Sequence, residues 1–155
     1  MKKLFESRLL SVALATAVAL LDQFSKFQVV HQLGQNKEFV LIPCWVNLRL
    51  VWNNGAAFSL FPQGASWLGL ISFVVSLALL YWLWRGGRKW TTLQLLAAGL
   101  LLGGTLGNGI DRWRLGAVVD FIKLVPISFP VFNFADIAIN LAVISLLIAN
   151  LRAKQ

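Results

Sequence analysis

Four apolar runs, each close to the length of a membrane span, constrain what this sequence can fold into. A helix of about 20 apolar residues crosses a bilayer core roughly 30 Å thick. Charged residues make up only 13% of the chain, whereas a soluble domain has about 25%. The sequence therefore predicts an all-α membrane protein, a four-transmembrane-helix bundle that forms one domain over residues 1–155. The expected spans are about 9–30, 67–84, 91–110 and 134–151.

The basic residues indicate how the bundle is oriented. Eight of the 14 Lys and Arg residues lie before the first run, between the second and third, or after the fourth. Because basic residues favour the cytoplasmic side, we expect cytoplasmic termini and two outward segments, about 31–66 and 111–133. The first run could also belong to a cleaved signal peptide, but it continues past any cleavage site, so we expect a retained span. The net charge of +8 then reflects orientation, and we expect no nucleic-acid partner.

The first outward segment contains strand signals. Glu38–Ile42 is a short strand-like run, and in Val46–Trp52 alternate positions are apolar. Asn53–Gly55 is a turn signal, and residues 57–61 (AFSLF) follow as a further candidate strand. We therefore expect a small extracytoplasmic β element between helices 1 and 2.

Polar residues gather at the outward ends of the spans. Asp22 lies about 13 residues beyond Leu9, which is roughly 20 Å along a helix. With spans one and three running outward and span four inward, the polar residues share one depth, and four of the six acidic residues belong to this layer. Its members are Asp22, Gln23, Lys26, Asn108, Asp111, Arg112, Asp120, Asn133, Asp136 and Asn140.

Some of these residues have a structural explanation. Asp22 and Lys26 are four residues apart, so they can pair on one helix face. Asn108, Asp111 and Arg112 also share a face, and a polar helix end is an equally good explanation for them.

Two further patterns predict helix packing and helix capping. Gly99, Gly103 and Gly107 repeat every four residues, as in closely packed membrane helices. Asn133 and Asp136 are three residues apart at the start of the fourth run, which resembles a capping box. The helix dipole would also favour an acid there, so Asp136 has a structural as well as a catalytic explanation.

Two carboxylates held near one another at the edge of an apolar bundle suggest water activation. Asp120 is expected in the loop between spans three and four, flanked by apolar residues, and Asp136 begins the fourth span. Such a pair tends to share one proton, so one acid can activate water while the other protonates a carbonyl. The chain has one histidine, His31, and one cysteine, Cys44. We therefore expect no Cys/His zinc site and no cofactor. If the protein is a peptidase, an aspartic mechanism remains.

Five sequence blocks, in order and spacing, resemble lipoprotein signal peptidase, also called signal peptidase II. The resemblance covers nearly the whole chain and is far more specific than any single block. The blocks are DQFSK at 22–26, NNGAAF at 53–58, GGTLGNGIDR at 103–112, VVDF at 118–121 and FNFAD at 132–136.

The resemblance implies roles for individual residues. Asp120 and Asp136 match the catalytic pair, with neither assigned as acid or base. Asp22 and Lys26 look more architectural than catalytic. Substrate-binding or supporting roles are implied for Asn53, Gly55, Asn108, Asp111, Arg112, Asn133 and Ala135.

The resemblance also implies a substrate and a location. The expected protein is an intramembrane aspartic endopeptidase of the bacterial plasma membrane that cuts diacylglyceryl-modified prolipoproteins just before the lipidated cysteine. Its active site would lie near the extracytoplasmic face, in contact with membrane lipids, and cyclic peptides of the globomycin type would inhibit it.

Other classes are compatible with intramembrane acids. A small transporter would use Asp22 or Asp136 as a proton or cation site, although such sites usually lie near the bilayer midplane. A non-enzymatic scaffold would use the polar groups for packing alone. Intramembrane proteases of the presenilin kind need a GxGD motif, which this chain lacks.

Overall fold

The computed structural model describes residues 2–34, 37–55, 64–85 and 90–152, with side chains described from Ser7 onward. It contains four helices long and apolar enough to cross a membrane, as the sequence predicted. They are α1 (Lys2–Gln32), α2 (Ala65–Arg85), α3 (Thr92–Leu115) and α4 (Phe134–Arg152). Each helix corresponds to one of the expected spans, and α3 runs five residues further than expected, to Leu115.

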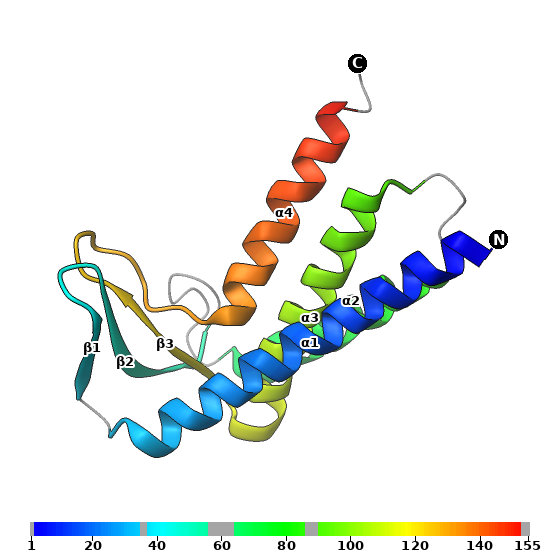
Figure 1. Ribbon diagram of the computed structural model, residues 1–155. Coiled ribbons are helices and arrows are strands. Elements are labelled where there is room, and N and C mark those ends of the chain that lie inside the picture. The colour runs from blue at the N-terminus through cyan, green and yellow to red at the C-terminus, as the bar shows by residue number, and fades with distance from the viewer. Residues whose placement is uncertain (1, 35–36, 56–63, 86–89, 153–155) are drawn as a thin grey trace.

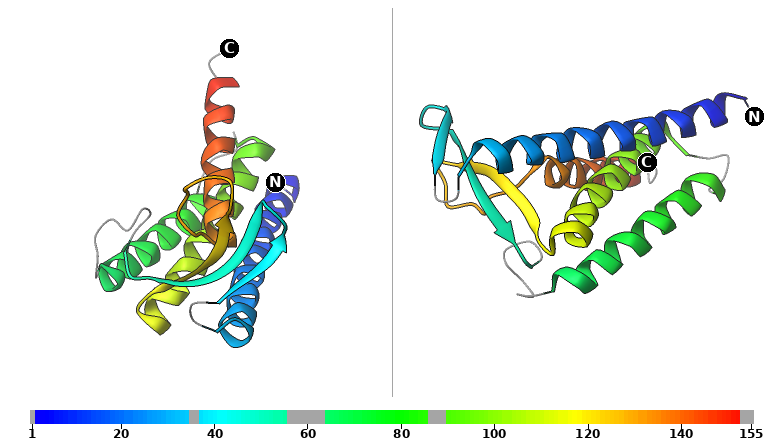
Figure 2. Two further views of the ribbon diagram at one scale, coloured as in Figure 1. Left: turned by 90° about the vertical axis from the view of Figure 1, so that its left-hand side faces the viewer. Right: turned by 90° about the horizontal axis from the view of Figure 1, so that it is seen from below.

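Helix α3 lies at the centre of the bundle. In its most apolar stretch, 61% of the residues are buried, compared with 22% in each of the other three helices. Figure 1 and Figure 2 show α1, α2 and α4 arranged around α3, with the sheet at one end of the helices. The start of α1 and the end of α4 lie at the opposite end (Figure 1).

Glycine lets α1 approach α3 closely, which confirms the packing expected of the four-residue repeat. A Cβ atom added at Gly99 would lie 2.6 Å from the Ser11 carbonyl oxygen, and one at Gly103 would lie 2.6 Å from the Ala15 carbonyl oxygen. Contacts this short force the backbone to move, so these positions need glycine. The close approach brings the polar residues of α1 within reach of α3.

A three-stranded antiparallel sheet confirms the expected β element. The strands β1 (Glu38–Ile42) and β2 (Val46–Asn53) form a hairpin whose turn places Cys44 in the left-handed region, at φ 64°. The third strand, β3 (Val118–Leu124), lies between α3 and α4 in the chain and pairs with β2. The candidate strand at 57–61 lies outside the described residues.

Asp120 lies in a strand, so its expected position in a loop was wrong. It occupies the middle of β3, where it is paired in register with Val51 of β2. The apolar residues on both sides of it, Val119 and Phe121, are buried. The pairing of two segments far apart in the sequence therefore fixes the position of this carboxylate.

We expect Gly103→Ala to destabilise the protein even though alanine favours helices. The added methyl group would collide with the Ala15 backbone and with Val18, and overpacking of this kind costs about 1–3 kcal/mol. Thermal unfolding in detergent measures the effect. Gly34→Ala is the matched control, because its Cβ would meet only Lys37 side-chain atoms at 3.5 Å or more. Equal melting temperatures for the two variants would contradict the close packing of α1 on α3.

Candidate active site

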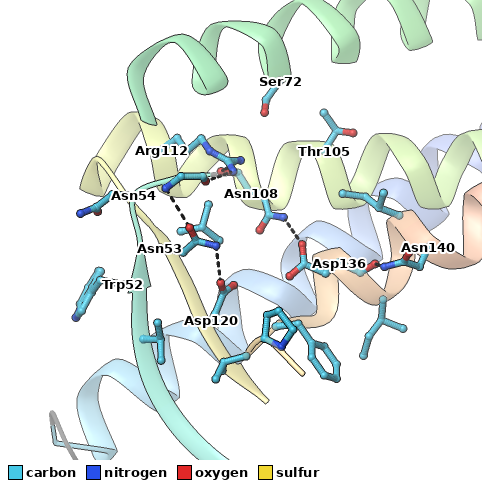
Figure 3. Close-up of a pocket in the computed structure, with 18 of the residues that line it drawn as sticks. Trp52, Asn53, Asn54, Ser72, Thr105, Asn108, Arg112, Asp120, Asp136 and Asn140 are labelled. Carbon is cyan, nitrogen blue, oxygen red and sulfur yellow. Dashed lines mark hydrogen bonds between the residues drawn. The ribbon is translucent and has the colours of Figure 1, made fainter. Parts of the chain in front are cut away.

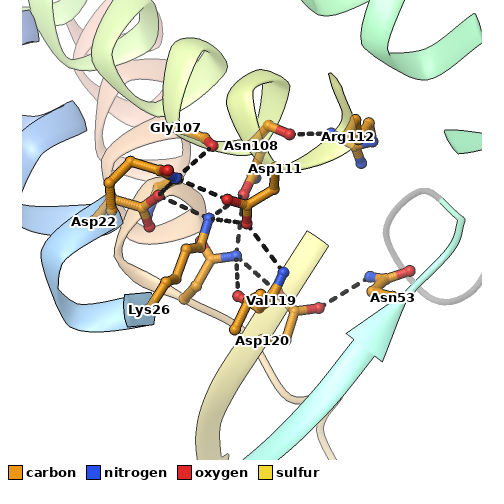
Figure 4. Close-up of polar contacts among 12 residues, drawn as sticks. Asp22, Lys26, Asn53, Gly107, Asn108, Asp111, Arg112, Val119 and Asp120 are labelled. Carbon is orange, nitrogen blue, oxygen red and sulfur yellow. Dashed lines mark hydrogen bonds and ion pairs between the residues drawn. The ribbon is translucent and has the colours of Figure 1, made fainter. Parts of the chain in front are cut away.

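A buried ammonium group organises the polar layer. Lys26 Nζ lies 2.7 Å from Asp22 Oδ2 and 2.9 Å from Asp111 Oδ2, and it donates a hydrogen bond of 3.0 Å to Asn108 Oδ1. All four side chains are buried. Figure 4 shows Lys26 reaching from α1 toward the C-terminal part of α3. The expected pairing of Asp22 with Lys26 is confirmed, and Asp111 is a second carboxylate partner that the helix-face pattern did not predict.

The two carboxylates around Lys26 also hold neighbouring backbone. Asp22 Oδ1 accepts a hydrogen bond of 2.9 Å from the Ala135 N–H in the first turn of α4. Asp111 Oδ2 accepts one of 3.0 Å from the Val119 N–H in β3. The cluster therefore connects α1, α3, α4 and β3 at one level of the bundle.

Asn108 joins this cluster to Asp136. Its Oδ1 accepts hydrogen bonds from Lys26 Nζ and from Asn133 Nδ2, each 3.0 Å long. Because both of these partners are donors, the Asn108 amide must direct its Nδ2 elsewhere, and it donates to Asp136 Oδ1 at 2.8 Å. Figure 3 shows this last bond between α3 and α4.

Asp136 also belongs to the expected capping box, which is confirmed. Its Oδ2 accepts a hydrogen bond of 3.1 Å from the Asn133 N–H, and its own N–H donates to Asn133 Oδ1 at 2.9 Å. The cap uses one carboxylate oxygen and leaves Oδ1 directed toward Asn108. The structural explanation of Asp136 is therefore correct and leaves a catalytic role open.

Asp120 accepts two amide donors. Asn133 Nδ2 donates to Oδ1 at 2.7 Å, and Asn53 Nδ2 donates to Oδ2 at 3.0 Å. The side chain is buried. Burial and the neighbouring charge of Asp136 raise the pKa of Asp120 to about 7, against the opposing effect of the two amide donors and of Lys26.

The placement of Asn133 between the two acids follows from a short backbone pairing. Phe132 and Ile122 exchange hydrogen bonds of 2.8 and 3.1 Å between their backbone groups. This pairing brings the start of α4 against β3, so that Asn133 touches both Asp120 and Asp136.

The end of β2 closes another side of the site. Asn53 Oδ1 accepts a hydrogen bond from the Gly55 N–H at 3.0 Å, which confirms the expected turn and directs Asn53 Nδ2 toward Asp120. Arg112 Nη2 donates to the Gly55 carbonyl at 3.2 Å, while its Nη1 donates to the Asn108 carbonyl at 3.4 Å. Arg112 Nε is buried and has no hydrogen-bond partner among the described residues.

Both acids line one cavity of about 1220 Å³. Its polar residues come from the end of β2, from β3 and from all three of the lining helices, and its apolar residues come from β2, β3, α2, α4 and the segment before α4. The lining residues are Val51–Gly55, Ile71, Ser72, Val75, Thr105, Asn108, Arg112, Val118, Asp120, Leu124, Phe129–Phe132, Asp136, Ile137 and Ile139–Leu141.

Nearly all the sequence-predicted site residues come together here. Asp22, Lys26 and Asp111 lie behind the cavity, and Ala135 is fully buried where α4 crosses Gly104 of α3. Within the described residues, no group of three or more His, Cys, Asp or Glu side chains is placed to hold a metal ion.

Three contributors were given no role from the sequence, although Gln23 was named in the polar layer. Gln23 donates to Asp111 Oδ1 at 2.8 Å and to the Gly107 carbonyl at 3.1 Å. Ser72 and Thr105 line the cavity from α2 and α3. The only sequence signal for these two was a short polar residue within an apolar span.

The fold and the site define a multi-pass membrane protein with two hydrogen-bonded carboxylates on the wall of an apolar cavity. Residues 14–152 match the family model described as Signal peptidase (SPase) II. The chain therefore belongs to the signal peptidase II family of peptidases, which confirms the resemblance seen in the sequence blocks.

Relatives and solved structures agree with this assignment. A lipoprotein signal peptidase of Synechococcus sp. (strain RCC307) is 56% identical over 140 residues, covering 90% of this chain and 93% of that protein. One from Gloeobacter violaceus (strain ATCC 29082 / PCC 7421) is 46% identical, covering 93% of this chain and 82% of that protein. A bacterial membrane enzyme solved by the in meso method at 2.3 Å resolution is 31% identical, with a TM-score of 0.87 over 94% of this chain and 89% of its own.

We expect Lys26→Met to destabilise the protein strongly. Removing the ammonium leaves Asp22 and Asp111 buried without their shared cation, and breaking a buried ion pair in this way costs about 3–5 kcal/mol. The control is Lys123→Met, which removes the part-exposed pair with Glu38 and should cost far less, because water screens exposed ion pairs. Thermal unfolding in detergent compares them, and similar losses would mean that the cluster does not hold the elements together.

We expect Asp120→Asn to gain stability relative to wild type as the pH rises from 5 to 8. The pKa of Asp120 is raised from 3.8 to about 7 in the folded protein. The folded state therefore holds this proton more tightly, and the associated stability is lost as the pH rises toward 7. Asparagine does not titrate. Melting temperatures across this range test the difference, and a constant gap between the two proteins would contradict the raised pKa.

Glu38→Gln provides the control for this pH series. Hydrogen bonds from Lys123 and Asn47 lower the pKa of Glu38 from 4.5, so this carboxylate stays ionised from pH 5 to 8. The gap between wild type and Glu38→Gln should therefore stay constant.

Proposed function

We propose that this chain is an intramembrane aspartic endopeptidase that removes signal peptides from bacterial prolipoproteins. The observation that carries the proposal is the arrangement of Asp120 and Asp136, two carboxylates on one cavity wall that Asn133 holds by separate hydrogen bonds. Membership of the signal peptidase II family supports the class of reaction. The relatives' name, lipoprotein signal peptidase, supports the class of substrate.

The two acids perform complementary proton transfers. The ionised carboxylate takes a proton from water, and the resulting hydroxide forms a bond to the carbonyl carbon of the scissile peptide. The protonated acid gives its proton to the carbonyl oxygen, which produces a tetrahedral diol. When the C–N bond breaks, a proton passes to the leaving amine and the diol becomes a carboxylic acid. Water is the only co-reactant.

The surroundings of the two acids favour one assignment of the shared proton. Asp120 is deeply buried, and its raised pKa of about 7 leaves it about half protonated at pH 7 and mostly protonated below that pH. Asp136 lies in the first turn of α4, where the helix dipole favours an anion. We therefore assign the resting proton to Asp120, as general acid, and the water-activating role to Asp136.

The cavity suits an apolar substrate with a polar cut site. A signal peptide and a diacylglyceryl group both partition into the bilayer, so they can reach the cavity laterally. Asn53, Gly55 and Arg112 stand beside Asp120 on the polar side, where they would contact the substrate backbone. We place the cut just before the lipidated cysteine of a diacylglyceryl-modified prolipoprotein.

The proposed orientation follows from the basic segments and the position of the site. The start of α1 and the end of α4 lie away from the sheet (Figure 1), so cytoplasmic termini place the sheet and the dyad at the outer face of the bacterial plasma membrane. Membrane lipids surround the helices in this arrangement. Globomycin-type cyclic peptides would inhibit by filling the same cavity.

We expect Asp120→Asn and Asp136→Asn each to abolish cleavage of a diacylglyceryl-modified prolipoprotein, because each variant lacks one half of the proton-transfer pair. The assay uses purified protein in detergent and identifies the new N-terminus by mass spectrometry. An unlipidated precursor in the same assay should remain uncut.

Glu6→Gln is the matched control for this assay, since it changes a carboxylate to an amide at the far end of α1 from Asp22. It should cut at the wild-type rate. Near-normal cleavage by either aspartate variant would overturn the dyad. Absence of cleavage by folded wild type would overturn the function and favour a transporter or a scaffold.

A further inference from the structure

Three polar side chains line the cavity deeper in the bundle than the two acids. They are Ser72 on α2, Thr105 on α3 and Asn140 on α4, and Figure 3 shows them on the helices beyond Asn108 and Asp136. Their neighbours in this part of the cavity are apolar, including Ile71, Val75 and Leu141. Polar groups at membrane depth are costly unless they are paired or functional.

Thr105 has an unused hydroxyl group. The residue as a whole is 8% exposed, and among the described residues its Oγ1 makes no hydrogen bond. Hydroxyl groups in membrane helices usually donate to the carbonyl one turn earlier, as Thr16 does to Val12 and Ser72 does to Leu68. The Thr105 hydroxyl therefore lies at the cavity wall, accessible from the cavity and without a partner among the described residues.

Asn140 supplies a hydrogen-bond acceptor to the same cavity. Its Nδ2 donates to the Asp136 carbonyl at 2.8 Å, which fixes the orientation of the amide and leaves Oδ1 without a donor among the described residues. The cavity therefore presents one free donor and one free acceptor from different helices. A peptide backbone carries both an N–H and a C=O group, whereas an ester carries only acceptors.

The depth of these groups fits the substrate residues before the cut. Thr105 is three residues before Asn108, about 4.5 Å along α3, and Asn140 is four residues beyond Asp136, about 6 Å along α4. An extended chain advances about 3.3 Å per residue. A substrate held at the dyad would therefore meet Thr105 and Asn140 one to two residues from the scissile bond.

We propose that Thr105 and Asn140 bind the unwound backbone of the signal peptide, one to two residues before the scissile bond. The inference rests on the proposed function. A peptide bond must leave the helix to be attacked, and its neighbouring N–H and C=O groups then lose their partners inside the membrane. The signal peptide extends from the dyad into the bilayer, because its N-terminus stays on the cytoplasmic side. Thr105 donates to a freed carbonyl, and Asn140 accepts from a freed N–H.

We expect Thr105→Val to raise KM for the lipidated prolipoprotein about three- to tenfold, the effect of one lost hydrogen bond, with kcat nearly unchanged. Valine keeps the shape of threonine but removes the hydroxyl. Since that hydroxyl has no partner in the free protein, the variant should melt no lower than wild type, so lower activity cannot result from unfolding. An unchanged KM in an active enzyme would overturn the proposal and leave the proposed function intact.

Two variants provide the controls. Thr105→Ser keeps the hydroxyl and should retain a KM close to the wild-type value. Thr16→Val makes the same change on α1, where the hydroxyl is exposed and bonded to Val12, and it should leave KM unchanged. Equal effects of Thr105→Val and Thr16→Val would contradict a specific contact at Thr105.

Modified substrates distinguish the peptide from the lipid as the bound group. A backbone ester in place of the amide at either of the two residues before the cut weakens the carbonyl acceptor, so the penalty of Thr105→Val should shrink. A substrate with a dialkyl ether lipid, which has no ester carbonyl, should keep the full penalty. If the penalty disappears only with the ether lipid, Thr105 contacts the diacylglyceryl group and the proposal is wrong. Failure of wild type to cut the unmodified lipidated substrate would instead refute the proposed function.

Discussion

The buried ammonium of Lys26 is the interaction on which the rest of the site depends. A cation at this depth is tolerated only when anionic and polar groups replace its water, and here Asp22, Asp111 and Asn108 do so. Each of the two carboxylates also takes a backbone N–H, from α4 or from β3. The same two carboxylates that satisfy Lys26 therefore also hold the two elements that carry Asp136 and Asp120.

Close helix packing makes this cluster geometrically accessible. Gly107 on α3 leaves room for the Asp22 carboxylate, since an added Cβ would lie 2.6 Å from Asp22 Oδ2. Ala135 is fully buried at the crossing of α3 and α4. Larger residues at these positions would separate the helices and withdraw the carboxylates from Lys26. Small residues along α3 thus set the distances at which the polar layer can form.

The sequence predicted the features that local patterns encode. The length of the apolar runs predicted the four spans, and the alternation of apolar residues predicted the hairpin of β1 and β2. The spacing of Asn133 and Asp136 predicted the capping box. The strand position of Asp120 could not be predicted locally, because it requires β3 to pair with β2, which lies in the segment between α1 and α2. The amide orientation of Asn108 depends on donors from two other elements, and the free hydroxyl of Thr105 can be recognised only once its surroundings are known.

The double use of Asn133 explains why structural and catalytic interpretations of Asp136 need not compete. The capping box requires Asp136 Oδ2 to face the Asn133 N–H, and the same turn directs the Asn133 side chain so that its Nδ2 meets Asp120. A helix cap thus fixes the position of one carboxylate and of the amide that orients the other. The cap lies in the first turn of α4, and the backbone pairing of Phe132 with Ile122 holds that turn against β3. Backbone geometry therefore specifies the relative placement of the two acids. Side-chain packing then has to fix only the position of the two acids along the bundle, and the contacts of Lys26 and of the α3 glycines do this.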